Sequence, residues 1–305
     1  HSIVNGLVSH IEQRNDVDSE VPCVMIIALV EGRYKVSIPF NEFYQKNPID
    51  MATVNMETKA GREEYVNRCA TMAAKLYSLN VPMVITTIQV DESTDAEAGV
   101  PAYVIVASRK AALDIIEETN YGDRPDGDGP RIQEGDFVRA QITSVARDSI
   151  AVVVGGVDTR VPLHALTFEY LVDARTKYKV GQEIMVQVEQ IIKEKDGHHI
   201  VEVNCKQPEL ERAKQMRSAL PIGSIVFGIV SSVAASKKQP GNINVLAYIK
   251  MYDLPVLVNN MPAKFLGSEP PRGSTVRLKV LNYLDNGMIL CRCIGTQGPM
   301  NFPNA

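Results

Sequence analysis

Between residues 134 and 206, short segments that alternate apolar and polar residues follow one another and are separated by turn residues. These segments cover residues 137–142, 149–154, 157–163, 184–188 and 200–203. Five short strands within about seventy residues are typical of a small closed barrel. A βαβ arrangement is excluded, because no segment between these strands is long enough for a crossover helix.

The residues of this stretch resemble one known family. The stretch opens with EGDFVRAQITSV, continues with DSIAVVVGGVDTRVPLHAL and YKVGQEIMVQVEQI, and ends in VNCK. It is similar to the S-one (S1) domain, an RNA-binding repeat in which a Gly-x-x-Val strand precedes a Val-Gly-x-x-Val/Ile strand by about forty-five residues. The resemblance implies an OB-type barrel over residues 134–207 that recognises unstacked RNA bases.

A second barrel of this kind is predicted for residues 21–118. Two strand-like runs flank the hairpin turn Glu31-Gly32. Residues 63–79 then carry apolar side chains at helical spacing, so the barrel contains a helical insertion before strands resume at residue 81. Its end, VIVASRKAAL, resembles the end of an S1 domain.

The segments around this barrel are interpreted from their polarity. Residues 1–20 are polar and are predicted to be an N-terminal extension with one or two helical turns. Residues 119–133, rich in Gly, Asp and Pro, are predicted to be a linker.

The same rhythm of strands returns in the last third of the chain. After a helical connector at residues 208–220, five alternating runs between residues 221 and 295 predict a third, more diverged S1-like barrel, followed by an irregular tail at 296–305. The predicted fold class is therefore mainly β, with three tandem OB-type five-stranded barrels, the first carrying a helical insertion.

The net charge of −4 hides a strong asymmetry along the chain. Residues 1–133 carry 12 Lys and Arg against 20 Asp and Glu, residues 134–210 carry 9 against 12, and residues 211–305 carry 11 against 4. Such segregation indicates either a polyanion-binding end or a basic face that serves solubility.

The sequence favours a protein without catalytic activity, cofactor or metal. Its five histidines belong to no ligand set, no Gly-rich phosphate loop opens a helix, and a Gly-x-Ser-x-Gly motif is absent. The five cysteines are scattered and odd in number, which fits reduced thiols in the cytoplasm. Apolar runs are too short to span a membrane.

Strand alternation places candidate contacts for nucleic acid on the outer surface of the third barrel. Tyr248, Lys250 and Tyr252 lie opposite the apolar residues of their strand, and Arg277 and Lys279 alternate with apolar neighbours. An OB barrel binds a single strand with cations that follow the phosphates and rings that stack on the bases. The alternative is a solubilising face with ordinary strand tyrosines.

Further candidates are basic residues of the strands and loops: Arg33, Lys35, Arg160, His164, Lys193, Lys195, Lys237 and Lys238. Arg160 and His164 lie where the S1 resemblance implies contacts. The aromatic residue that the family favours on its second strand is missing, because residues 148–151 read Asp-Ser-Ile-Ala. This departure weakens the expectation that the central barrel binds RNA by stacking.

The predicted function is non-catalytic binding of single-stranded RNA by barrels that act together through effective concentration. The resemblance suggests a bacterial or phage-like cytoplasmic protein that contacts mRNA or the ribosome. Two alternatives stay open: a protein–protein scaffold that uses the acidic first domain, and a single-stranded DNA binder of a mobile element. Nucleic-acid binding predicts a steep salt dependence, which the scaffold does not require.

Overall fold

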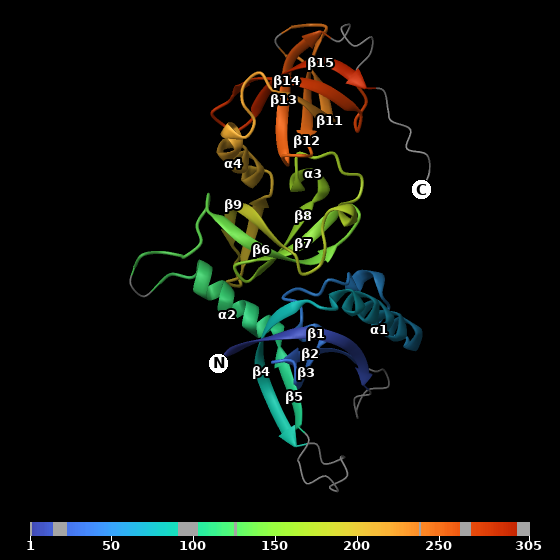
Figure 1. The fold of residues 1–305 in the computed structure, drawn as a ribbon. Coiled ribbons are helices and arrows are strands. Elements are labelled where there is room, and N and C mark those ends of the chain that lie inside the picture. Colours follow the sequence, from blue (N-terminus) through green and yellow to red (C-terminus); the bar gives the residue numbers. More distant parts are fainter. Residues whose placement is uncertain are drawn as a thin grey trace.

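The computed structural model describes residues 2–14, 23–90, 103–124, 127–237, 239–262 and 270–297. Three five-stranded sheets follow one another along the molecule, with helices α2 and α4 at the two junctions (Figure 1). This mainly β arrangement confirms the predicted fold class. Within the described residues, no helix combines the length and apolarity needed to cross a membrane.

The first barrel is closed and has a helical insertion. Its strands are β1 (Ile3–Arg14), β2 (Cys23–Val30), β3 (Tyr34–Pro39), β4 (Asn80–Val90) and β5 (Tyr103–Ser108), in the order β1-β2-β3-β5-β4. Between β3 and β4 lie η1 (Phe40–Glu42), η2 (Met51–Thr53), α1 (Lys59–Ala73) and η3 (Ala74–Leu76). The buried face of α1, which includes Val66 and Cys69, packs into the core of this barrel.

The prediction of an N-terminal extension is wrong, because residues 3–14 form the first strand. β1 pairs with both β2 and β4 and thereby closes the barrel. Six of its twelve residues are polar, and Gly6 and Val8 are its buried residues. A Cβ on Gly6 would lie 2.6 Å from the terminal methyl of Met83, so a larger residue at this inward position would require the Met83 side chain to shift. The strand therefore lacks the apolar alternation that identifies strands in a sequence.

The second barrel has the same cyclic strand order but is open on one side. Its strands are β6 (Phe137–Val145), β7 (Ser149–Val154), β8 (Val157–Pro162), β9 (Glu183–Lys193) and β10 (His199–Asn204), in the order β10-β9-β6-β7-β8. The short helices α3 (Leu163–Leu166) and η5 (Ala174–Thr176) follow β8. No backbone ladder joins β8 to β10 in the described structure, so the sheet has a seam there.

The third barrel is again closed. Its strands are β11 (Ile225–Ala235), β12 (Asn242–Ile249), β13 (Leu254–Pro262), β14 (Thr275–Tyr283) and β15 (Ile289–Gln297), in the order β11-β12-β13-β15-β14. The predicted connector before it is helical, with α4 (Gln207–Gln215) and η6 (Met216–Ser218). Cys291 and Cys293 point into its core as free thiols, and burial raises the pKa of both.

Helix α2 (Arg109–Tyr121) joins the first two barrels and was not predicted. The predicted domain end at residue 118 and the start of the predicted linker both fall inside it. Arg109 is buried and donates to the Phe43 carbonyl at 2.7 Å. At the other end, Glu117 accepts from the His199 backbone N–H at 2.6 Å, and the Tyr121 hydroxyl donates to the Val154 carbonyl at 2.9 Å. Both ends of the helix are therefore tied to neighbouring strands and loops.

A buried carboxyl joins the second and third barrels. Glu209, on α4, accepts from the Thr167 hydroxyl at 2.5 Å and from the Phe168 backbone N–H at 2.9 Å. The Tyr248 hydroxyl of the third barrel lies 3.3 Å from the same carboxyl. Burial raises the pKa of Glu209. Removing a hydrogen-bond partner from a buried polar group destabilises the folded state. These contacts therefore hold the junction in one arrangement.

We expect Gly156→Ala to destabilise the junction of the first two barrels. Gly156 has φ +99°, and a Cβ there would lie 2.5 Å from the Glu117 backbone nitrogen of α2. The strained φ and the clash together should cost roughly 2 to 4 kcal/mol in the free energy of unfolding, measured by urea and circular dichroism. Gly197→Ala is the control, since Gly197 has φ +94° but open space around it and should cost only about 1 to 2 kcal/mol. Equal losses would contradict the close approach.

A second prediction concerns acid stability. Lys35 Nζ donates to Glu12 Oε1 at 2.5 Å, and bonds from Lys35, Arg14 and His10 lower the pKa of Glu12 from 4.5 to about 2. The stabilisation is therefore present above pH 4.5 and is lost as the pH falls toward 2. Because the group is partly exposed, Glu12→Gln should cost less than about 1 kcal/mol at pH 7.

The measurement compares urea unfolding of wild type and Glu12→Gln at pH 7 and near pH 2. The difference between the two proteins should be much smaller at the lower pH, where Glu12 is about half protonated in the folded state. Glu31→Gln is the control, because Glu31 pairs with Arg33 on an exposed turn. A difference that is equal at both pH values would contradict the role of the charged Glu12.

Candidate nucleic-acid interface

The predicted position of Tyr248 on an open surface is wrong. The side chain points away from the barrel interior, as alternation requires, but its exposed fraction is only 1%. The second barrel and α4 cover this face of β12. The Tyr248 hydroxyl donates to Asp253 at 2.6 Å, and Lys177 of the second barrel lies 5.3 Å from the centre of its ring. Burial raises the pKa of Tyr248, and the ring cannot reach a base.

The other predicted residues of the third barrel do not form one surface with it. Lys250 approaches Glu169 of the second barrel at 3.6 Å, and Tyr252 packs partly buried against the third core. Arg277 and Lys279 are exposed on β14, but β11 lies between β14 and β12. Sequence alternation reports which face of a strand is outward, whereas strand adjacency depends on the closed topology.

The remaining predicted cations are spread over several faces. Arg33 pairs with Glu31 at 3.0 Å and lies over the Tyr34 ring, and Lys35 is held by Glu12. Other exposed candidates lie on the β9–β10 hairpin, on α3 and in the β11–β12 loop: Lys193, Lys195, His164 and Lys237. Lys238 lies outside the described residues. Among the predicted residues of the first two barrels, Arg160 is the one that lines a cleft between them.

The seam of the second barrel faces the helical insertion of the first barrel across a cleft of about 470 Å³. The second barrel contributes residues of β7, β8 and β10, including Arg160. The first barrel contributes Tyr44, Lys46 and Lys75 from its insertion. The cleft thus exists only because two domains about one hundred residues apart in sequence lie side by side.

Three cations of the cleft remain available to solvent. The Arg160 guanidinium donates to the Ser149 hydroxyl at 2.7 Å and lies 3.6 Å from Asp148, yet its side chain is 70% exposed. Lys46 is 2.7 Å from Glu194 and is equally exposed. Lys75 is exposed and forms no ion pair among the described residues. Salt bridges this exposed are weak and exchange readily for a phosphate contact.

Tyr44 supplies an aromatic ring to a barrel that lacks one on its second strand. It is partly buried in the cleft wall and packs against Phe43 and Phe40, with ring centres 5.0 and 5.3 Å apart. Burial raises its pKa to about 12, so the ring stays a neutral phenol. The sequence predictions missed Tyr44, Lys46 and Lys75, because no local pattern indicates that an insertion faces another domain.

One cluster of carboxylates and histidine beside the cleft serves the packing of the two barrels. Asp114, Glu117 and His198 hold ligand-type atoms within 4.8 Å of one another. Gln45 donates to both carboxylates, at 3.3 and 3.0 Å, and Glu117 also accepts from His199. These groups hydrogen-bond across the junction of the insertion, α2 and β10.

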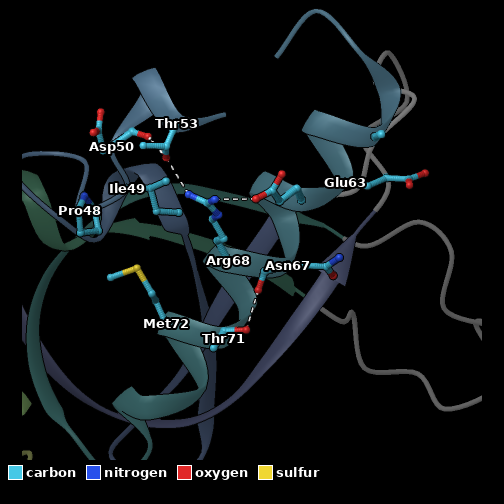
Figure 2. A pocket seen from close by; sticks show the side chains of 11 residues that line it. Pro48, Ile49, Asp50, Thr53, Glu63, Asn67, Arg68, Thr71 and Met72 are labelled. Atoms are coloured by element: carbon cyan, nitrogen blue, oxygen red, sulfur yellow. Dashed lines mark hydrogen bonds and ion pairs between the residues drawn. The ribbon is translucent and has the colours of Figure 1, made fainter. Parts of the chain in front are cut away.

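A separate hollow of about 660 Å³ lies between α1 and the loop before it (Figure 2). Its cation Arg68 donates to the Thr53 hydroxyl at 2.8 Å and to Glu64 at 2.5 Å, as the dashed lines mark. Asp50 and Glu63 also line it. Because carboxylates outnumber the engaged arginine, this hollow repels phosphate.

Comparisons with known proteins agree with the resemblance of the central stretch. Residues 131–199 match the family model described as the S1 RNA binding domain. A comparison with curated proteins finds no match.

Three solved structures are similar to the chain at low sequence identity. The first is a chain of the a/eIF2alpha-aDim2p-rRNA complex of Pyrococcus horikoshii. The aligned region covers 28% of the present chain and 58% of that chain, at 16% identity and a TM-score of 0.22. The second is a multidomain protein with nucleic acid binding domains from Streptococcus pneumoniae. The aligned region covers 95% of the present chain and 72% of that protein, at 11% identity and a TM-score of 0.22. The third is Drosophila Unr CSD456. The aligned region covers 97% of the present chain and 97% of that chain, at 11% identity and a TM-score of 0.19.

The strand order establishes the fold independently of these matches. All three sheets have the cyclic order first-second-third-fifth-fourth, which is the order of a five-stranded OB barrel. The chain therefore carries, over residues 131–199, a match to the S1 RNA binding domain, set between two closed barrels of the same strand order.

Proposed function

We propose that the chain binds single-stranded RNA, without catalysing a reaction, in the cleft between its first two barrels. The observation that carries the proposal is the position of Arg160, Lys46 and Lys75 around one cleft at the open seam of the S1-like barrel. A strand needs cations at its phosphates and an unstacked base needs a flat partner. Tyr44 is the aromatic side chain of the cleft that we propose as this flat partner.

The proposed ligand is RNA rather than DNA. A protein can distinguish an RNA strand from a DNA strand through the 2′-hydroxyl, which both donates and accepts hydrogen bonds. The cleft offers hydroxyl groups on Ser144 and Thr159 that suit such contacts. We further propose mRNA or ribosome-associated RNA as the partner and the cytoplasm as the location; the five free cysteines fit a reducing compartment.

The first test is a cleft variant, Lys46→Ala/Lys75→Ala/Arg160→Ala, measured by anisotropy with labelled oligouridylate at several salt concentrations. Each lost phosphate contact should flatten the slope of log K against log salt by about 0.7, so three should flatten it by about 2. At low salt the affinity should fall at least tenfold. A matched deoxyoligonucleotide should bind more weakly than the RNA.

The control variant is Arg131→Ala/Arg139→Ala/Lys179→Ala, which removes the same charge from exposed positions outside the cleft. The slope of log K against log salt for this variant should differ from the wild-type slope by no more than the effect of about one phosphate contact. The reason is that distant charges are screened at ordinary salt. Equal losses of affinity in both variants would show a general charge effect and contradict the proposal that RNA binds in the cleft. Equal binding of RNA and DNA would contradict RNA preference alone.

A second test addresses the absence of catalysis. End-labelled RNA incubated with stoichiometric protein, with and without Mg²⁺, should be recovered at full length after separation on a denaturing gel. Cleavage that persists in freshly purified wild type, and disappears in a variant of the acidic groups Asp114 and Glu117, would contradict the proposal. Those carboxylates are chosen because they lie beside the cleft.

A further inference from the structure

The third barrel has an exposed face on the side formed by β11, β14 and β15. We call it the β14 face and define it by outward side chains of these strands: Ile225, Phe227, Arg277, Lys279, Leu281, Arg292 and Ile294. Phe227 is 52% exposed, although phenylalanine is among the residues most often buried. The face combines an open ring, aliphatic side chains and cations.

Strand register brings these side chains into rows across the sheet. Ile225 pairs with Lys279, which in turn pairs with Arg292 of β15. In the next row, Phe227 pairs with Arg277, and Arg277 with Gly295. Neighbouring strands lie about 4.8 Å apart, so each row places its side chains in direct contact distance. The Phe227 ring thus lies beside the cation Arg277 of the adjacent strand β14.

The charge of this face has one sign. The strands β11, β14 and β15 contain no Asp or Glu. Among the described residues, Arg277, Lys279 and Arg292 form no ion pair with a carboxylate. By contrast, Lys250 on the covered side of the same barrel faces Glu169. A surface of unpaired cations favours a polyanion, and the exposed Phe227 favours one with unstacked bases.

The packing of the domains explains why this side is the available one. The outer face of β12 is covered, since Tyr248 is buried against Lys177 and Glu209. β11 runs from that covered edge to the open β14 face, with Ile229 opposite Tyr248 and Phe227 one step further.

We infer that the β14 face is a second binding surface for a single nucleic-acid strand, separate from the cleft of the first two barrels. Arg277, Lys279 and Arg292 contact phosphates, and Phe227 stacks on a base. This inference extends the proposed RNA binding to the third barrel, whose basic charge the first barrel lacks. Two surfaces on one chain raise the affinity for a strand long enough to reach both.

The most direct test uses the fact that the chain contains no tryptophan. Phe227→Trp introduces a single indole fluorophore on the β14 face of the full chain. Addition of oligouridylate of about 30 nucleotides, longer than the roughly 4 to 16 that one OB fold covers, should quench its emission by stacking. Tyr103→Trp is the control, because Tyr103 is similarly exposed, at 55%, on the first barrel. Its emission should not change.

Affinity measurements complete the test. Arg277→Ala/Lys279→Ala/Arg292→Ala should flatten the salt slope by about 2. Phe227→Ala should weaken binding about fivefold or more. The control variant at Arg131, Arg139 and Lys179 serves here too. Circular dichroism melts check that each variant is folded.

The outcomes separate this inference from the proposed cleft. No quenching in Phe227→Trp and an unchanged slope in the β14-face variant would overturn the inference, while loss of binding in the cleft variant would still uphold the cleft. Quenching of Phe227→Trp and weaker binding by the β14-face variant, with unchanged binding by the cleft variant, would uphold the inference. The same result would overturn the proposal that RNA binds in the cleft. No binding by wild type would overturn both. An RNA-independent blue shift that grows with protein concentration would mean that a second copy covers the face, and would overturn the inference.

Discussion

The arrangement of the first two barrels depends on one buried guanidinium. Arg109 is 1% exposed, donates to the Phe43 carbonyl, lies 4.7 Å from the Phe43 ring and reaches Asp158 at 3.4 Å. A buried charge is tolerated only when partners surround it, so the insertion, α2 and β8 must meet at this point. Tyr44 and Lys46 follow Phe43 closely in the chain and are thereby held against the open seam of the second barrel.

The three sheets share one strand order, yet they expose different sides. The seam of the second barrel faces the first, and the outer face of β12 in the third barrel is covered by the second. Each contact between barrels therefore hides one surface and leaves another available. A cleft on one side and the β14 face on another would let a single strand follow the chain across several domains.

The sequence predicted much of the fold. Apolar alternation and turn residues located fourteen of the fifteen described strands approximately, since both signals are local. The misses were elements with weak local signals: β1, in which glycine occupies an inward position and leucine an outward one, and α2, which begins inside the predicted end of the first domain. Of the predicted contact residues, Arg160, Arg277 and Lys279 lie on the two surfaces proposed here.

By itself, the sequence determined the number of barrels, the helical insertion, the charge of the third barrel and the outward side of strand residues such as Tyr248, Arg277 and Lys279. Tertiary structure alone decided which outward faces are open. Tyr248 points outward as alternation requires and is nevertheless buried, because segments distant in sequence cover it. Periodicity records the preference of a residue for its own core, whereas coverage of an outer face depends on contacts with other domains that leave no periodic pattern.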